Sequence, residues 1–96
     1  MTFNAQTPLK ALNTTIKSLF DDAGRCLDDD VSLAISYFED AKELIKASQL
    51  VRQNKIGELS NFIDEMDTMI REYAVCALNK DLGAEFVINS LGYEVA

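Results

Sequence analysis

The sequence predicts an all-α protein: an antiparallel three-helix bundle with a short fourth helix at its C-terminal end, similar to a four-helix bundle. Apolar residues recur every three or four positions over three long segments. The 96 residues contain one Pro and four Gly, so few positions interrupt a helix. The hydrophobic content of 48% suits one core. We therefore expect a single helical domain over residues 1–96, with helices near 8–24, 29–53, 56–78 and 81–91.

The helix expected at 8–24 has signals at both ends. Thr7 is a suitable N-cap, and Pro8 fits the first helical position because its missing N–H would have no partner there. Gly24 is a suitable residue to end the helix. The apolar residues between these signals predict one buried face, formed by Leu9, Leu12, Ile16, Leu19 and Ala23.

The helix expected at 29–53 begins in a run of three aspartates, whose carboxylates accept from free N–H groups and favour the positive end of the helix dipole. One apolar stripe is formed by Val31, Ala34, Phe38, Ala41, Ile45 and Ser48, and a second by Leu33, Tyr37, Leu44 and Val51. A helix that is apolar on two sides needs neighbours on two sides, so we place it in the middle of the bundle. It should end near Arg52-Gln53-Asn54.

The segment 56–78 has the most regular pattern and predicts one long helix, packed antiparallel to its neighbour. Its apolar face comprises Ile56, Leu59, Ile63, Met66, Ile70, Tyr73 and Ala77, widened by Phe62, Met69 and Cys76. Asp81 is a candidate N-cap for a short helix at 81–91, which Gly92 would end. We expect Cys26 and Cys76 to be buried thiols at the same end of the bundle, in a reducing compartment.

Charge and hydropathy limit the partners. Sixteen acidic against nine basic residues give a net charge of −7, which disfavours direct binding to nucleic acid or to a membrane. Apolar runs fall far short of the roughly 20 residues that span a bilayer. We therefore expect a cytoplasmic protein whose partner is a protein with a basic surface. A homodimer is also expected, because the helices present more apolar surface than a small bundle covers.

Acidic residues are concentrated where the first two helices should meet. Antiparallel packing would bring together five aspartates, which we call the acidic pole: Asp21, Asp22, Asp28, Asp29 and Asp30. Lys10, Arg52 and Lys55 would lie toward the opposite end. We interpret the acidic pole as a candidate docking surface for a basic protein. The alternative is that these residues cap helices and solvate a turn.

The twelve residues from Asp28 to Glu39 resemble an EF-hand calcium loop. Oxygen-bearing side chains occupy loop positions one, three, five, nine and twelve, and Ile35 occupies the aliphatic eighth position. The resemblance implies a calcium-binding helix-loop-helix protein. The sequence departs from the family at Leu33, where the family uses Gly for a sharp turn, and the same residues also continue the helical stripes.

Two acidic couples, Asp40 with Glu43 and Asp64 with Asp67, should lie on adjacent antiparallel helices. This arrangement resembles the all-α nucleoside-triphosphate pyrophosphohydrolases of the MazG type, in which acidic couples hold magnesium. The resemblance implies a Mg-dependent nucleotide pyrophosphohydrolase. The family's couples are mainly Glu, and here both couples fall on the polar side of their helices, so a solvated face is the competing interpretation.

The remaining motifs point away from catalysis. The chain has no His, no P-loop and no GxGxxG motif, so we expect no catalytic residue, no metal site and no cofactor. The predicted function is a non-enzymatic acidic helical module that binds or inhibits a basic protein. Its size, charge and architecture are similar to those of bacteriocin-immunity proteins, small phage inhibitors and anti-CRISPR proteins, an analogy without a shared motif. The calcium and magnesium interpretations are the alternatives.

Overall fold

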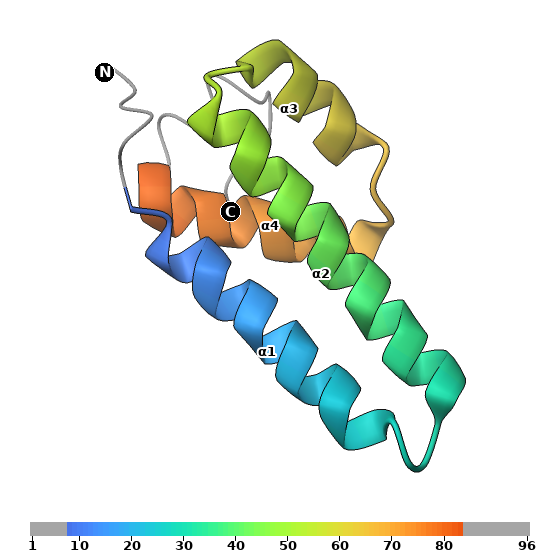
Figure 1. Ribbon diagram of the computed structural model, residues 1–96. Helices are drawn as coiled ribbons and strands as arrows, with labels where there is room; N and C mark the ends of the chain where they lie inside the picture. The colour runs from blue at the N-terminus through green and yellow to red at the C-terminus, as the bar shows by residue number, and fades with distance from the viewer. Residues whose placement is uncertain (1–7, 84–96) are drawn as a thin grey trace.

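The computed structural model describes residues 8–83, and within that range it contains four α-helices (Figure 1). The helices are α1 (Lys10–Cys26), α2 (Val31–Arg52), α3 (Ile56–Asp64) and α4 (Thr68–Leu82). α1 and α2 run antiparallel, side by side, as a hairpin. α3 packs on the second half of α2, and α4 crosses behind α2 in the view of Figure 1 to reach the first half of α1. The predicted all-α bundle is confirmed.

The core lies at the end of the molecule where all four helices meet, which we call the base. Its largest fully buried side chains are Leu9, Leu12, Leu44, Val51, Leu59, Ile63 and Leu78. Met66 and Ile70, at 3% and 2% exposure, belong to the same cluster. Burial of these side chains removes apolar surface from water and supplies the main free energy of folding. The buried face expected for residues 59–70 is therefore confirmed.

The other end of the molecule is the hairpin end, where α1 and α2 extend beyond α3 and α4 and are joined by a turn (Figure 1). Here the two helices approach through small side chains, because Ala23 and Ala34 are both fully buried. Phe20 and Phe38 pack beside this seam, with ring centroids 5.9 Å apart. Only two helices form this end, so fewer side chains are buried in it than at the base.

The start of α1 is capped by a residue distant in sequence. The carboxylate of Asp81, in the last turn of α4, accepts hydrogen bonds from the backbone N–H groups of Ala11 (2.7 Å) and Leu12 (2.9 Å). Such groups in the first turn of a helix have no partner within the helix. The prediction that Asp81 starts a separate helix is wrong, because α4 continues through it to Leu82.

Other predicted helix ends have different outcomes. α1 continues through Gly24 to Cys26, so Gly24 does not end the helix. A side chain at Gly24 would meet no other atom within 4 Å, so neither packing nor the turn requires glycine there. The predicted start of α1 is wrong, because the helix begins at Lys10 with Leu9 as its N-cap, so Pro8 is not its first residue. Thr7, Gly92 and residues 84–91 of the expected fourth helix lie outside the described residues.

Both predicted ends of α2 are confirmed. Asp30 is the N-cap, and its Oδ1 accepts from the backbone N–H of Leu33 at 3.1 Å. At the other end, Asn54 adopts a left-handed conformation with φ of 57°. The N–H of Lys55 then donates to the carbonyl of Leu50 at 2.9 Å, which is the Schellman arrangement that ends many helices.

The single helix predicted over 56–78 is wrong, because a link at residues 65–67 separates α3 from α4. The Arg71 side chain donates through Nη2 to the backbone oxygens of Asp64 (3.0 Å) and Met66 (2.9 Å). The guanidinium thus satisfies carbonyl groups that the interrupted helix leaves without backbone partners. The break allows α4 to turn away from the direction of α3 and to cross to α1.

Candidate functional site

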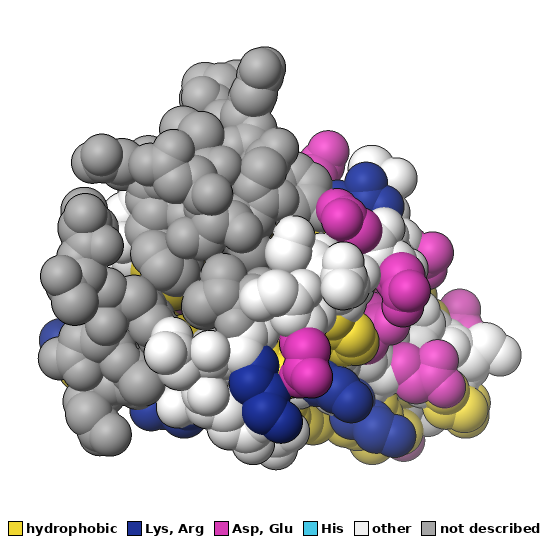
Figure 2. Space-filling view, turned by 90° about the horizontal axis from the view of Figure 1, so that it is seen from above, with side chains coloured by type: hydrophobic (Ala, Val, Ile, Leu, Met, Phe, Trp, Pro, Cys, Tyr) yellow, Lys and Arg dark blue, Asp and Glu magenta, His cyan; other side chains and the backbone are white. Residues whose placement is uncertain are grey.

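The acidic pole lies at the hairpin end. Asp21 and Asp22 are in the last turns of α1, Asp28 and Asp29 are in the turn, and Asp30 caps α2. All are exposed except Asp22, which is half-buried. Figure 2 views the molecule from above, from the side away from the hairpin turn of Figure 1, and acidic side chains also predominate on the right half of that face. The five residues are therefore brought to one end of the molecule, as the sequence predicted.

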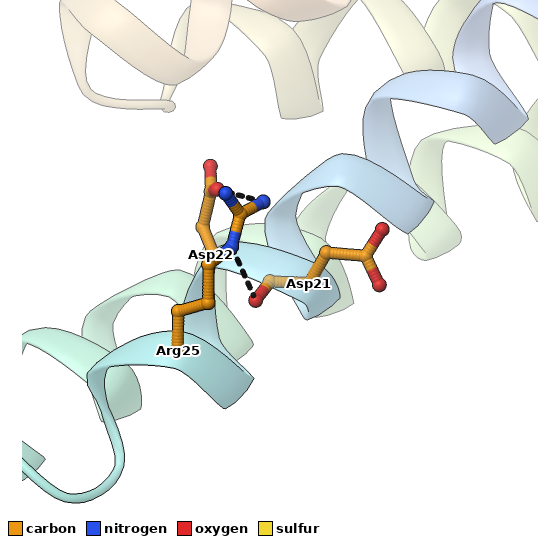
Figure 3. A network of polar contacts seen from close by, with 3 residues as sticks. All are labelled: Asp21, Asp22 and Arg25. Atoms are coloured by element: carbon orange, nitrogen blue, oxygen red, sulfur yellow. Dashed lines mark hydrogen bonds and ion pairs between the residues drawn. The ribbon is translucent and has the colours of Figure 1, made fainter.

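One basic residue lies within the acidic pole. Arg25 Nη2 forms an ion pair with Asp22 Oδ1 at 3.0 Å, and its Nε donates to the backbone oxygen of Asp21 at 3.4 Å (Figure 3). The pair is solvent-exposed, with 74% and 40% of the two side chains accessible, so it contributes little to stability. Arg25 can therefore be displaced from Asp22 at small cost by a cation from another molecule.

A cleft of about 430 Å³ opens beside the acidic pole, between α1, α2 and α4. Its lining residues are Thr14, Thr15, Ser18, Leu19, Asp22, Tyr37, Asp40, Met69 and Tyr73. We call it the α1–α2–α4 cleft. It combines two carboxylates with two phenol rings and a thioether, and it is lined by no Lys or Arg. This chemistry suits a Lys or Arg side chain, whose charge would meet the carboxylates while its alkyl stem packs on Met69 and the rings.

The electrostatics of Asp40 fit the same conclusion. Burial raises the pKa of Asp40, and the negative charges of Asp67 and Glu39 raise it further. Burial is also the largest cause of the raised pKa of Glu43, followed by the charges of Asp40, Asp67 and Glu39. Asp40 forms no ion pair with any residue in the described range. A bound cation would favour the ionised carboxylate and would lower its pKa.

Sequence reasoning missed exposed apolar side chains at the hairpin end and on α4. We expected Val31 and Leu33 to lie in buried stripes, but they are 58% and 41% exposed. Met69 and Tyr73 were expected to pack in the core, but they are 58% and 45% exposed and line the α1–α2–α4 cleft. The helical periodicity is correct in each case. Val31 and Leu33 are exposed because α3 and α4 cover only the base. Met69 and Tyr73 are exposed because the chain breaks at residues 65–67 and α4 crosses to α1.

The structure can be compared with the calcium and the magnesium interpretations. Residues 31–39 form the first turns of α2, so the calcium loop implied by the EF-hand resemblance is not formed. Of the acidic couples, Asp67 lies close enough to Asp40 and Glu43 to raise the pKa of both. Within residues 8–83, no three Asp, Glu or Cys side chains form a group that could hold a metal ion.

The cysteines do not occupy the positions expected. Cys26 ends α1 at the hairpin end and is half-buried, whereas Cys76 is exposed on α4, beside Lys10 and Ala11 at the start of α1. The expectation that the two are buried at the same end is therefore wrong. It assumed that α4 continues the direction of α3, whereas α4 crosses the hairpin. Both thiols are free.

Comparisons with known proteins give no further guidance: no protein family, curated protein or solved structure matches the chain. None of the helices in residues 8–83 combines the length and the apolar character needed to cross a membrane. The functional argument therefore depends on the chemistry of the site itself.

Proposed function

We propose that this chain is a non-enzymatic protein–protein interaction module that binds a basic segment of a partner protein at the acidic pole and the α1–α2–α4 cleft. The observation that carries the proposal is the cleft, in which Asp40, without an ion pair among the described residues, and Asp22, held only by the exposed Arg25, lie beside apolar and aromatic side chains. A cation is the missing complement of such a surface.

The pole and the cleft have different roles in this proposal. The exposed aspartates of the pole create a negative field that speeds the encounter with a basic protein, and salt screens this field. The cleft then holds one Lys or Arg side chain, and the contacts to Met69 and Tyr73 slow its release. If the bound segment is the nucleic-acid-binding surface of the partner, the module acts as an inhibitor.

We place the protein in the cytoplasm, where free thiols such as Cys26 and Cys76 stay reduced.

The test measures binding of a short, fluorescein-labelled lysine-rich peptide by fluorescence anisotropy. The double variant Asp22→Asn, Asp40→Asn should lower the affinity by roughly tenfold, because two charge-assisted contacts are lost. The matched control is Glu58→Gln, Glu65→Gln, which removes the same charge from exposed positions outside the cleft and should change the affinity less than about twofold.

The same assay separates attraction by net charge from recognition by the cleft. The peptide with its lysines acetylated should not bind, because its charge is lost. Association of the charged peptide should slow as salt rises. If the cleft variant and the control variant lose the same affinity, net charge alone attracts the peptide and the proposal fails.

A further inference from the structure

The hairpin has a second apolar face, on the side opposite to the cleft. Tyr37 lines the cleft and its neighbour Phe38 contacts Phe20, so adjacent residues of α2 lie on either side of the seam with α1. In the same way, Leu19 of α1 lines the cleft and Phe20 lies on the opposite side. We call this opposite side the outer face. It is the side of the hairpin that α4 does not cross.

The outer face exposes large apolar side chains at helical spacing. Val31, Ile35 and Phe38 follow at steps of four and three on α2, which places them on one stripe. Val31 and Ile35 are 58% and 51% exposed. Phe20 of α1 is 39% exposed, and Leu27, which follows the last residue of α1, is 49% exposed. Exposed apolar side chains that are grouped on one face, rather than scattered singly, are typical of interaction sites.

Along this face, exposed acids lie at the turn and exposed lysines lie toward the base, where Glu39 is an acidic neighbour of Lys42. Asp28 and Asp29 lie in the turn, next to the exposed Leu27 and Val31. Lys17 precedes Phe20 by three residues and Lys42 follows Phe38 by four, so both lysines lie on the same side of their helices as the rings, nearer the base. With a rise of 1.5 Å per residue, the acidic and basic ends are about 18 Å apart. The apolar residues lie between them.

We propose that the outer face is a homodimer interface, in which two copies pack their hairpins antiparallel as a four-helix bundle. A two-fold axis near Ile35 and the Phe20–Phe38 pair would bury the apolar residues of both copies. It would also place the acidic turn of each copy against Lys17 and Lys42 of the other. A parallel arrangement would instead place acid against acid and lysine against lysine.

The charge pattern favours a second copy over a foreign basic helix. A uniformly basic partner would be attracted by the turn and repelled by Lys17 and Lys42, whereas a second copy in antiparallel orientation meets the opposite charge at both ends. The α1–α2–α4 cleft lies on the other side of the hairpin and stays open in this dimer. Asp28 and Asp29 of the acidic pole would then face lysines of the second copy, so Asp22 is the residue of the pole that remains in the cleft for a basic partner. The dimer would then offer two clefts, and a partner with two basic segments would gain avidity.

Light scattering of the full chain during size-exclusion chromatography tests the interface. The native chain should show a mass near twice the 10.7 kDa of one copy. Ile35→Asp should give the monomer mass with unchanged helical circular dichroism, because Ile35 is half exposed in a single copy. Met69→Asp is the matched control: Met69 is similarly exposed but lies in the cleft, so this variant should stay dimeric.

A charge swap tests the antiparallel geometry. Asp29→Lys and Lys42→Asp should each weaken the dimer several-fold, and the double variant should restore it. Within one copy the two residues are about 20 Å apart along α2 and the turn, beyond the Debye length of about 8 Å, so restoration would report contact between copies.

A monomer mass at all concentrations, or a dimer lost in Met69→Asp but not in Ile35→Asp, would overturn the proposal. Because the cleft residues are unchanged in Ile35→Asp, peptide binding by that variant tests the proposed function separately.

Discussion

The base and the hairpin end contain the same two helices but use them differently. At the base, α1 and α2 contribute Leu9, Leu12, Leu44 and Val51, each at most 1% exposed, to a core that α3 and α4 complete. At the hairpin end, the same helices bury Ala23 and Ala34 and expose Val31 and Ile35. The stability of the molecule therefore comes from the base. The hairpin end keeps its apolar and acidic side chains available for contacts with other molecules.

The largest expected effect on the free energy of unfolding is the difference between a substitution at the base and one at the hairpin end. Leu44→Ala removes a fully buried side chain of the base and should lower the free energy of unfolding by about 2–5 kcal/mol, because it leaves a cavity. Val31→Ala, at 58% exposure, should change it by less than about 0.5 kcal/mol. Urea denaturation followed by circular dichroism measures both. Equal losses would show that the hairpin end is as important for stability as the base.

An intermediate effect on stability is expected when the Asp81 cap on α1 is removed. Asp81→Ala removes the acceptor for two backbone N–H groups and should cost about 1–2 kcal/mol. Hydrogen exchange should also accelerate at the amides of Ala11 and Leu12. Glu72→Ala, an exposed acidic position on the same helix, is the control and should leave these two amides protected. Unchanged exchange in Asp81→Ala would show that the cap does not hold the start of α1.

The smallest effect concerns the raised pKa of Asp40. An acid whose pKa is higher in the folded state than in the unfolded state binds more protons when folded, so its contribution to stability falls as pH rises through the folded-state pKa. Asp40→Asn should therefore raise the melting temperature slightly at pH 7. The gain should shrink as the pH falls toward the ordinary value of 3.8 and vanish below it. A gain that is equal at all pH values would contradict this origin.

The neighbouring charge can be tested directly. Asp67→Asn removes a negative charge that raises the pKa of Asp40, so a carboxyl titration by NMR should show the pKa of Asp40 moving down. Asp21→Asn, in the acidic pole, serves as the control, because Asp21 is not among the charges that raise this pKa. A pKa of Asp40 that moves equally in both variants would show a general charge effect.

Sequence reasoning predicted the local features of the fold and missed those that depend on the direction of α4. The Asp30 cap and the end of α2 near Asn54 are set by residues close in sequence, so their chemistry was sufficient. The break at residues 65–67 contains no Gly or Pro. Met66 remains in register with the buried face, and therefore the apolar period passes through the break unchanged.

The candidate site was predictable in part. The five aspartates of the acidic pole were found because an antiparallel hairpin brings the end of α1 to the start of α2. The cleft was not found, because Met69 and Tyr73 come from α4 and reach α1 only when α4 crosses the hairpin. The outer face was missed because its exposure depends on where the covering helices stop. The cleft and the outer face both depend on how the helices pack in three dimensions, and the apolar periodicity of the sequence does not specify that packing.

The cap on α1 also determines when α1 can become fully folded during synthesis. Asp81 is seventy residues downstream of Ala11, so during synthesis α1 lacks this acceptor until α4 has been translated. A nascent chain that ends before α4 therefore has an α1 whose first turn frays and whose Leu12 lacks the side chains of α4 that pack in the same core. A truncated chain that ends before α4 would therefore expose the start of α1 to proteases.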